Sequence, residues 1–418
     1  MTSNQDPDVL IVGAGVPGAT LALALASGGL KPLLVDRAPL SDQWEPTFDG
    51  RAWAIAYSAF RQWKALGLGE ALEPHAQCIE QIMVTDGRRP GAAAPGGPSP
   101  FLLRFDSGEI EGRSDGEPLG YMLENRRVRV ALAAALKAAG IEILAPARVT
   151  KADFTAAAAR LALDDGRTLT APLAVAADGR GSAMRKAAGI GAIGWPYAQS
   201  GVVATVGLGR PHGGVAHEYF LPSGPFAILP LTDDRVSLVW TESKSAAAAL
   251  MAASPPAFQA HLERRFGPFL GKIQPLGGRF NYPLSLELAE RMAGPRLALI
   301  GDAAHAVHPI AGQGLNLGLK DVAALAQVLV EAQRLGEDIG SLLVLDRYAA
   351  WRRFDNVMLA AATDGFVRLF SNDNPMLRLA RGAGMSLVGA LAPARRFFMH
   401  EAGGATGDLP RLFRGEAL

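Results

Sequence analysis

The sequence predicts an α/β fold in which a parallel-sheet domain is interleaved with a mainly antiparallel β-sheet domain and is followed by a helical C-terminal region. Three observations lead to this prediction. Short apolar runs that end at glycine-rich turns or at Asp-Gly and Gly-Asp pairs are typical of parallel strands buried on both faces. Stretches with polar/apolar alternation, prolines and aromatic residues lie between them. Residues 342–400 keep apolar residues at helical spacing.

The chain opens with the parallel-sheet pattern. The apolar run Val9–Val12 leads into the turn Gly13–Gly18, and a helix of small and apolar residues is expected to follow. Pro17 suits the first turn of this helix, because its missing N–H costs no hydrogen bond there. A second strand at 32–35, ending at Asp36, completes a βαβ unit.

The pattern returns twice further along the chain. Buried strands are predicted at 173–177 and 297–300, and helices at 126–139 and 315–330. The chain therefore leaves the parallel-sheet domain and comes back to it. We predict the parallel-sheet domain from residues 1–78, 126–190 and 291–335, the antiparallel domain from 79–125 and 191–290, and the helical region from 336–418.

Length, charge and cysteine content exclude several classes of protein. The 418 residues are enough for two or three domains, and the formal net charge of +1 predicts no basic surface for nucleic acid. Cys78 is the only cysteine, which excludes an internal disulfide, a Cys-x-x-Cys redox pair and a cysteine zinc site.

The N-terminal residues predict neither a signal peptide nor a membrane span. Residues 1–8 are polar and lack a basic region. Residues 9–30 are uncharged and long enough to cross a bilayer, but glycines and a proline interrupt them, and a buried strand-turn-helix explains them better. We expect a cytoplasmic protein, with peripheral contact to the inner membrane left open.

The first turn predicts a dinucleotide site of the Rossmann-like kind. Gly13, Gly15 and Gly18 let the backbone approach a pyrophosphate, and the N-terminus of the next helix offers free N–H groups and partial positive charge. The Asp36 carboxylate can accept hydrogen bonds from both hydroxyls of an adenosine ribose. The alternative is a glycine-rich turn that packs a helix on a sheet; strand, helix and acid together favour the dinucleotide.

A second strand-loop-helix turn lies far along the chain, where Gly301-Asp302 leads to a helix that begins near Gly314. Two such turns suggest one long cofactor held at both ends, and FAD is the obvious candidate. Asp302 can bind ribityl hydroxyls, and the helix N-terminus would stabilise the anionic N1/O2 edge of reduced flavin. Pro309 would hold the loop rigid against the flavin ring.

Four further residues leave alternatives open. Arg51 is interpreted as a guanidinium near the pyrophosphate, with an ordinary surface arginine as the alternative. Asp178 either serves a cofactor or caps the following helix. His305 and His308 lack a third metal ligand, so we predict no metal site and favour packing and loop hydrogen bonds for both.

Taken together, the motifs resemble those of a known family. Three motifs resemble, in order and spacing, the three fingerprints of single-component flavoprotein aromatic hydroxylases, whose prototype is p-hydroxybenzoate hydroxylase. They are the turn Gly13–Gly18 with Asp36, the pair Asp178-Gly179 and the pair Gly301-Asp302. The loop His308–Asp321 (HPIAGQGLNLGLKD) is similar to that of the ubiquinone-biosynthesis hydroxylase branch. The resemblance covers most of the chain.

The resemblance implies roles for the candidate residues. Asp178 matches an acid that family members use for both FAD and the nicotinamide donor. Pro309 would lie near the reacting oxygen and is the catalytic candidate. The implied FAD-binding residues are Gly13, Gly15, Gly18, Asp36, Arg51, Arg126, Asp178, Gly301, Asp302, Gly314, Leu315 and Asn316.

The resemblance also implies a reaction. The sequence has no second Gly-x-Gly-x-x-Gly, so NAD(P)H would have no Rossmann domain of its own, in agreement with the family, where the donor binds transiently. By the resemblance, NAD(P)H reduces non-covalent FAD, O2 adds at C4a, and a phenol ring attacks the distal oxygen of the resulting hydroperoxide. In the ubiquinone branch the substrate is a polyprenylated phenol, which calls for an apolar tunnel and for docking to a membrane or a quinone-biosynthesis complex. The residue that deprotonates the phenol is not identified; His217 and Tyr219 are weak candidates.

Two questions stay open at this point. Residues 377–399, which mix arginines with Leu, Met and Phe, are either a basic and apolar docking surface or, as we favour, an ordinary packed helix pair. The function itself has two alternatives: hydroxylation of a small soluble phenol, and a non-catalytic flavin-bearing scaffold in a biosynthetic complex.

Overall fold

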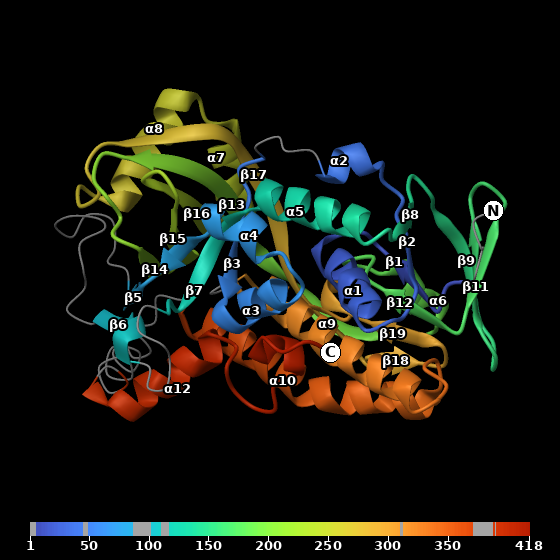
Figure 1. Cartoon of the computed structure of the whole chain (residues 1–418). Coiled ribbons are helices and arrows are strands. Elements are labelled where there is room, and N and C mark those ends of the chain that lie inside the picture. Colours follow the sequence, from blue (N-terminus) through green and yellow to red (C-terminus); the bar gives the residue numbers. More distant parts are fainter. Residues whose placement is uncertain are drawn as a thin grey trace.

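The protein contains two large β-sheets and a layer of helices that runs along both. Figure 1 shows the parallel sheet on the right, the antiparallel sheet on the left and the long helix α10 (Leu342–Phe370) beneath them. The fold class predicted from the sequence is therefore confirmed. The computed structural model describes residues 6–44, 49–86, 102–109, 117–309, 312–370, 388 and 390–418.

The parallel sheet forms around the first strand of the chain. β1 (Val9–Val12) is buried along its whole length and lies between two parallel neighbours, so it has apolar side chains on both faces. The order is β18-β19-β12-β1-β2-β8, with only the edge strand β18 antiparallel. The other strands are β2 (Pro32–Val35), β8 (Glu142–Leu144), β12 (Leu173–Ala176), β18 (Ala293–Gly294) and β19 (Leu297–Leu299).

Helices cover this sheet and pack against one another. α1 (Val16–Ser27) is buried over most of its length and contacts α9 (Gln313–Arg334), which follows the second glycine turn. α5 (Asn125–Ala138) packs on α1 with Val128, Leu132 and Leu136. The predicted helices at 126–139 and 315–330 are thus confirmed, and α9 extends beyond its predicted limits at both ends.

The second sheet is antiparallel except for one pair. Its order is β20-β17-β13-β16-β15-β14-β5-β6, and only β14 and β5 run parallel. α7 (Lys244–Ala252) and α8 (Pro255–Phe266) cover one face and bury Phe226, Trp240 and Phe258 in a separate core. The strands are β5 (Gln81–Asp86), β6 (Leu102–Asp106), β13 (Ala192–Leu208), β14 (Val215–Leu221), β15 (Gly224–Leu231), β16 (Arg235–Ser243), β17 (Ile273–Ala289) and β20 (His305–Ala306).

Smaller elements complete the molecule. One three-stranded sheet has the order β3-β7-β4 and another the order β11-β10-β9. These and the remaining short elements are β3 (Ala52–Ala56), β4 (Gln77–Ile79), β7 (Gly120–Glu124), β9 (Val149–Phe154), β10 (Ala159–Leu163), β11 (Thr168–Ala171), α2 (Leu40–Trp44), α3 (Tyr57–Ala65), α4 (Gly69–Leu72), α6 (Ala183–Ala187), α12 (Ala392–Ala402) and the 3-10 helices η1 (Glu73–His75), η2 (Ser107–Glu109), η3 (Gly301–Ala303) and η5 (Arg411–Arg414).

The predicted domain boundaries stay a prediction. The strand β4 crosses the predicted boundary after residue 78, and it pairs with β7, which lies in the segment predicted for the antiparallel domain. Most of the segment 377–399 lies outside the described residues, and α12 is its described part. Among the described residues, no helix combines the length and the apolar character needed to cross a membrane.

Candidate active site

A cavity of about 1040 Å³ lies where the carboxyl ends of β1 and β12 meet the second sheet. One end is lined by the residues that follow these strands, including Gly15, Ala177 and Gly179. The other end is lined by apolar side chains of the second sheet and of α10. Ligands bind at the carboxyl ends of strands in open α/β sheets, so the position is that of a binding site.

The first glycine turn forms a cradle that opens into this cavity. A Cβ on Gly13 would lie 2.2 Å from the carbonyl oxygen of Ala177, and one on Gly18 would lie 2.0 Å from that of Gly13, so both positions require glycine for packing. Gly15 is different, because a Cβ there would meet no atom within 4 Å and would project into the cavity. Gly15 is also the N-cap of α1 and offers no side-chain cap, which leaves the first N–H groups for an anion.

Asp36 stabilises this turn. Its Oδ2 accepts a hydrogen bond of 2.7 Å from the backbone N–H of Ala14, and its Oδ1 accepts one of 2.9 Å from that of Ala38. A carboxylate has about four lone-pair positions, so two stay free for ribose hydroxyls. The acid lies beside the turn, as the motif predicts, although its side chain is not part of the cavity wall.

The second glycine turn faces the same cavity. Gly312 adopts a left-handed conformation (φ +64°) as the N-cap of α9, and this helix has neither a side-chain cap nor an acidic residue in its first turn. A Cβ on Gly318 would lie 3.1 Å from the Cα of Gly301, so α9 packs directly on the end of β19. Two uncapped helix N-termini therefore point toward one cavity, which suits a ligand with a pyrophosphate at one end and an anionic ring at the other.

The Asn316 side chain joins α9 to β3. Its Oδ1 accepts a hydrogen bond of 2.8 Å from the N–H of Ala56, and its Nδ2 donates one of 2.9 Å to the carbonyl oxygen of Ala54. Both amide groups are thus used within the protein. Asn316 lines the cavity and holds β3 as its wall.

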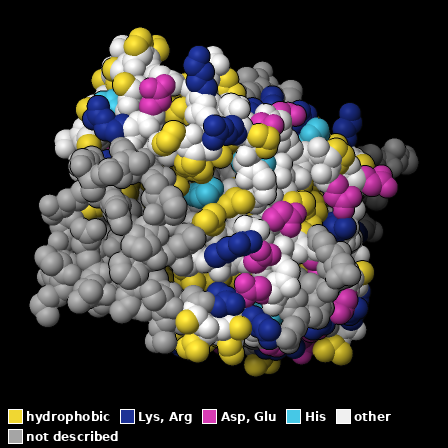
Figure 2. Space-filling model, turned by 90° about the vertical axis from the view of Figure 1, so that its left-hand side faces the viewer, with side chains coloured by type: hydrophobic (Ala, Val, Ile, Leu, Met, Phe, Trp, Pro, Cys, Tyr) yellow, Lys and Arg dark blue, Asp and Glu magenta, His cyan; other side chains and the backbone are white. Residues whose placement is uncertain are grey.

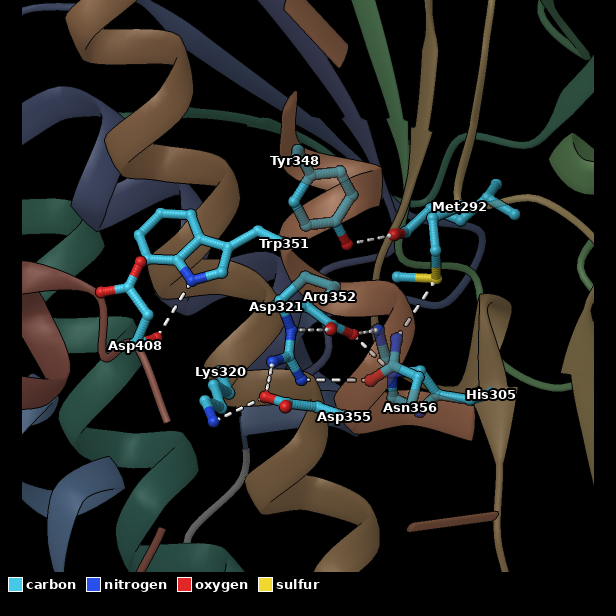
Figure 3. A network of polar contacts seen from close by, with 12 residues as sticks. Met292, His305, Lys320, Asp321, Tyr348, Trp351, Arg352, Asp355, Asn356 and Asp408 are labelled. Atoms are coloured by element: carbon cyan, nitrogen blue, oxygen red, sulfur yellow. Dashed lines mark hydrogen bonds and ion pairs between the residues drawn. The ribbon is translucent and has the colours of Figure 1, made fainter. Parts of the chain in front are cut away.

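A buried network of charges supports the second turn from behind (Figure 3). Asp321 is fully buried; its Oδ2 accepts a hydrogen bond of 3.1 Å from the N–H of Gly301 and lies 2.5 Å from Nε2 of His305. Its Oδ1 accepts one of 2.9 Å from Nε of Arg352, which is also fully buried. Burial alone would raise the pKa of Asp321, but His305 and Arg352 outweigh it and lower that pKa below its usual value.

The network continues from α9 into α10. Arg352 donates to Asp355 at 2.6 Å and to Asn356 at 3.1 Å, and Lys320 lies 2.6 Å from the same Asp355 carboxylate. Tyr348 donates to the carbonyl oxygen of Leu299, at the end of β19, at 2.7 Å. The three elements that surround the second turn are therefore held together by buried polar contacts.

Two charged residues of the predicted site line the cavity and form ion pairs with partly exposed side chains. Asp302 pairs with Arg180 at 3.2 Å, and both side chains are almost half exposed, so this contact can rearrange. Arg51 lines the cavity and pairs with Asp49 at 2.8 Å. The predicted residues that line the cavity are Gly15, Arg51, Gly301, Asp302, Pro309, Gly314, Leu315 and Asn316.

Two predicted cofactor residues have partners within the protein. The Arg126 side chain pairs with Glu124 at 2.8 Å and is not part of the cavity wall. Asp178 accepts a hydrogen bond of 3.1 Å from the N–H of Met184 and another from the hydroxyl of Ser182, which is the N-cap of α6. Its predicted role toward a cofactor stays a prediction. No group of side chains among the described residues could hold a metal ion.

The two weak candidates for the phenol-deprotonating residue and the second histidine of the loop lie in two different places. His217 and Tyr219 stack on each other at 6.1 Å, and Phe269 contacts His217 edge-on at 5.0 Å, so both rings pack in the core on the far side of β14. His308 is fully buried, lies edge-on to Tyr197 at 5.3 Å, and burial lowers its pKa to about 4.

Sequence reasoning missed three functional candidates: Asp321, Arg352 and Glu218. The first two are charged residues in apolar helices, which is a signal for a buried pair, but nothing local indicates that α10 lies against α9. Glu218 lies between His217 and Tyr219 in β14. The alternation of a strand would have placed its side chain on the face opposite to these two rings.

Comparisons with known proteins agree with this geometry. The family model described as FAD binding domain matches residues 6–354. The ubiquinone hydroxylase UbiL of Rhodospirillum rubrum is 45% identical over 100% of this chain and 95% of its own length. The 3-demethoxyubiquinol 3-hydroxylase of Escherichia coli is 34% identical over 92% and 95%. The p-nitrophenol 4-monooxygenase PnpA of Pseudomonas putida, a solved structure, has the same fold, with a TM-score of 0.77, 20% identity and coverage of 96% and 99%.

Proposed function

The chain belongs to the FAD-dependent aromatic hydroxylase family and, within it, to the ubiquinone-biosynthesis branch; from this we propose that it hydroxylates the ring of a polyprenylated phenol. It is thus an FAD-dependent monooxygenase. The observation that carries the choice of substrate is the cavity, which joins a dinucleotide cradle to a long apolar chamber.

FAD fits the polar end of the cavity. The turn at Gly15 and the N-terminus of α1 would hold the pyrophosphate, with Asp36 at the ribose and Arg51 close by. Asp302 and the N-terminus of α9 would hold the flavin end. Bound FAD, reduced by NAD(P)H, supplies the activation of O2 that ring hydroxylation needs.

The apolar end suits a polyprenyl tail. Apolar side chains from two sheets, α10 and α12 line it, and burying a tail there removes apolar surface from water at about 25 cal/mol per Å². Phe366, Leu369 and Phe398 line the cavity and are also more than a third exposed, so we assign the entrance to this place. The residues of the apolar end are Ile79, Ile82, Val84, Leu103, Phe105, Phe220, Phe366, Leu369, Phe370, Val388, Phe398 and Met399.

The same entrance supports peripheral contact with a membrane, where a polyprenylated phenol dissolves. Large apolar side chains on α10 and α12 face solvent, among them Phe354 at 71% and Phe397 at 59% exposed. Hydrophobic side chains also reach the surface between charged ones on the face that Figure 2 shows. An interfacial surface of this kind would bring the substrate to the entrance without a membrane span.

The chain itself positions the ring and keeps water away from it. Pro309 and Leu315 form part of the wall at the flavin end, and the apolar face of the second sheet excludes water from the ring. A dry site matters because activated oxygen otherwise leaves as H2O2 without reaching the substrate.

Two measurements test this function. Mass spectrometry of a host strain that lacks the gene should show a prenylphenol one hydroxylation short of the quinone. Purified protein with FAD, NAD(P)H and 18O2 should place one labelled oxygen on the ring of a short-chain prenylphenol. A normal quinone profile together with stimulation by a small soluble phenol would contradict the proposal in favour of that substrate. Protein that holds FAD but transfers no oxygen to any phenol would favour a scaffold.

A further inference from the structure

Among the described residues that the second sheet contributes to the cavity wall, Glu218 alone has a carboxyl group. In β14 the rings of His217 and Tyr219 pack in the core on the far side, so the alternation of the strand turns Ala216, Glu218 and Phe220 toward the cavity. His217 also borders the cavity, but its ring stacks on Tyr219 and Phe269, away from it. Neither the glycine turns nor FAD accounts for a carboxyl group here.

The strand register places Glu218 between the two ends of the cavity. Val203 of β13 pairs with Val239, Val239 with Ala227, Ala227 with Glu218, and Glu218 with Val84 of β5. All five line the cavity and form one row across the sheet. Adjacent strands are about 4.8 Å apart, so Glu218 lies three strands, or about 14 Å, from Val203, on the way from the flavin end to the apolar end.

The surroundings of this carboxyl group are apolar. Its neighbours across the strands are Ala227 and Val84, and Ala216 and Phe220 lie beside it on its own strand. Burial is the cause that raises the pKa of Glu218 to about 8. A carboxyl group with such a pKa takes up and releases a proton near neutral pH.

The other ionisable residues of the described cavity wall are poor proton acceptors. Asp302 pairs with Arg180 at the dinucleotide end. Burial raises the pKa of the Tyr282 hydroxyl, which keeps it protonated, and burial lowers the pKa of His217 to about 4. The complete set of these other ionisable residues in the described wall is Arg51, Arg180, His217, Tyr282 and Asp302.

We propose that the Glu218 carboxylate accepts the proton of the substrate's phenolic hydroxyl, an assignment that rests on the proposed function. The phenolic O–H bond breaks, a carboxyl O–H bond forms, and the electron pair stays on the phenolic oxygen. The resulting phenoxide is more electron-rich at the ring carbons and reacts more readily with electrophilic oxygen. Glu218 also sets how deep the aromatic head enters, because it offers the hydroxyl an acceptor in an apolar wall.

The test compares wild type with Glu218→Gln, Glu218→Asp and, as a control, Glu331→Gln, all loaded with FAD. Gln keeps the size of the side chain but accepts no proton, so hydroxylation of a short-chain prenylphenol should fall about 100-fold or more. Asp keeps the carboxyl group and should restore part of the rate. Glu331→Gln makes the same acid-to-amide change at an exposed position on α9 that is not part of the cavity wall, so the rate per bound FAD should stay within a few-fold of wild type.

Two further readouts separate proton transfer from a loss of packing. Near-ultraviolet difference spectra should show a phenolate band when the phenol binds to wild type at pH 8 and none with Glu218→Gln. A fluorinated phenol that is already ionised at the assay pH needs no acceptor, so with this substrate the defect of Glu218→Gln should shrink at least tenfold. Equal phenolate bands, or equal turnover of the unfluorinated phenol, would overturn the assignment. A Glu218-dependent band without hydroxylation by wild type would contradict the proposed function and leave the assignment standing.

Discussion

Asp321→Asn tests whether the buried charges behind the second glycine turn stabilise the protein. The substitution removes a negative charge that faces both Arg352 and His305 in a fully buried position. Loss of one partner from a buried ion pair costs roughly 3–5 kcal/mol, because the other charge is left without compensation. Asp355, at 2.6 Å, still pairs with Arg352. We therefore expect the lower end, about 3 kcal/mol of unfolding free energy.

The pH at which this effect is measured follows from the pKa of Asp321, which lies below its ordinary value of 3.8. A carboxyl group whose pKa is lower in the folded state stabilises the protein fully above its unfolded-state pKa and loses that contribution as the pH falls through the folded-state value. The difference between wild type and Asp321→Asn should thus be constant from pH 6 to 8. It should begin to shrink only below about pH 4, where the Asp321 carboxylate of the unfolded chain takes up a proton, and it should vanish once the pH has fallen through the lower folded-state pKa.

Urea unfolding followed by tryptophan fluorescence measures the loss, and FAD titration measures its effect on the site. Affinity for FAD should also fall, because Asp321 accepts a hydrogen bond from the N–H of Gly301 in the turn. Glu331→Gln is the matched control: this acid is exposed on the same helix and should change stability by less than about 0.5 kcal/mol.

A second variant identifies the physical cause. In Asp321→Asn with Arg352→Met, the orphaned guanidinium is gone, and an apolar replacement of a buried pair is often close to neutral. The double variant should therefore be more stable than Asp321→Asn alone. An Asp321→Asn variant within about 1 kcal/mol of the Glu331→Gln control, or a double variant less stable than Asp321→Asn alone, would refute the reasoning.

Four other substitutions test the geometry of the site and of the buried loop histidine. Gly15→Ala should weaken FAD binding but leave stability near wild type, because the added Cβ projects into the open cavity. Gly18→Ala should also lower the unfolding midpoint, because its Cβ would lie 2.0 Å from a carbonyl oxygen. Equal unfolding midpoints for the two variants would contradict this. Asp302→Ala should reduce FAD retention on gel filtration without changing the circular dichroism spectrum, because its pair with Arg180 is almost half exposed; unchanged FAD occupancy would show that the acid is misplaced. His308→Leu should make the stability of the protein less sensitive to acid. Burial lowers the pKa of His308 from 6.5 to about 4, so between these pH values the unfolded state binds a proton that the folded state does not. Wild type therefore loses roughly 3 kcal/mol of unfolding free energy over that range. Parallel stability curves from pH 6.5 to 4 would contradict a buried neutral imidazole.

At Asp178 the structure shows a contact that the sequence cannot indicate, and the cofactor role of this acid stays a prediction. Asp178-Gly179 matches a fingerprint, and the Asp178 carboxylate accepts a hydrogen bond from the Met184 N–H in the first turn of α6, whose N-cap is Ser182. A strand-end acid followed by flexible residues is compatible with either role. Whether its oxygens face a helix or a ligand depends on where the next six residues turn.

The sequence by itself determined the two glycine turns, their strands and helices, and through them the cofactor class. Gly13, Gly15 and Gly18 lie within a few residues of one another, and their spacing indicates that the backbone of the turn comes close to neighbouring atoms and to a ligand. Periodicity likewise revealed α5 and α9, because burial of one helix face is a local pattern.

Only the tertiary structure decided which side chains from distant segments meet. Asp321 and Arg352 belong to two helices whose packing depends on the whole core. The sequence shows a charged residue in each apolar helix but does not indicate which residue it pairs with. Period 2 divides the residues of β14 between two faces but does not say which face covers the cavity, so Glu218 and His217 could be told apart only once the sheet was packed. Short-range geometry is encoded in neighbouring residues, whereas a cavity is bounded by segments whose proximity arises from folding.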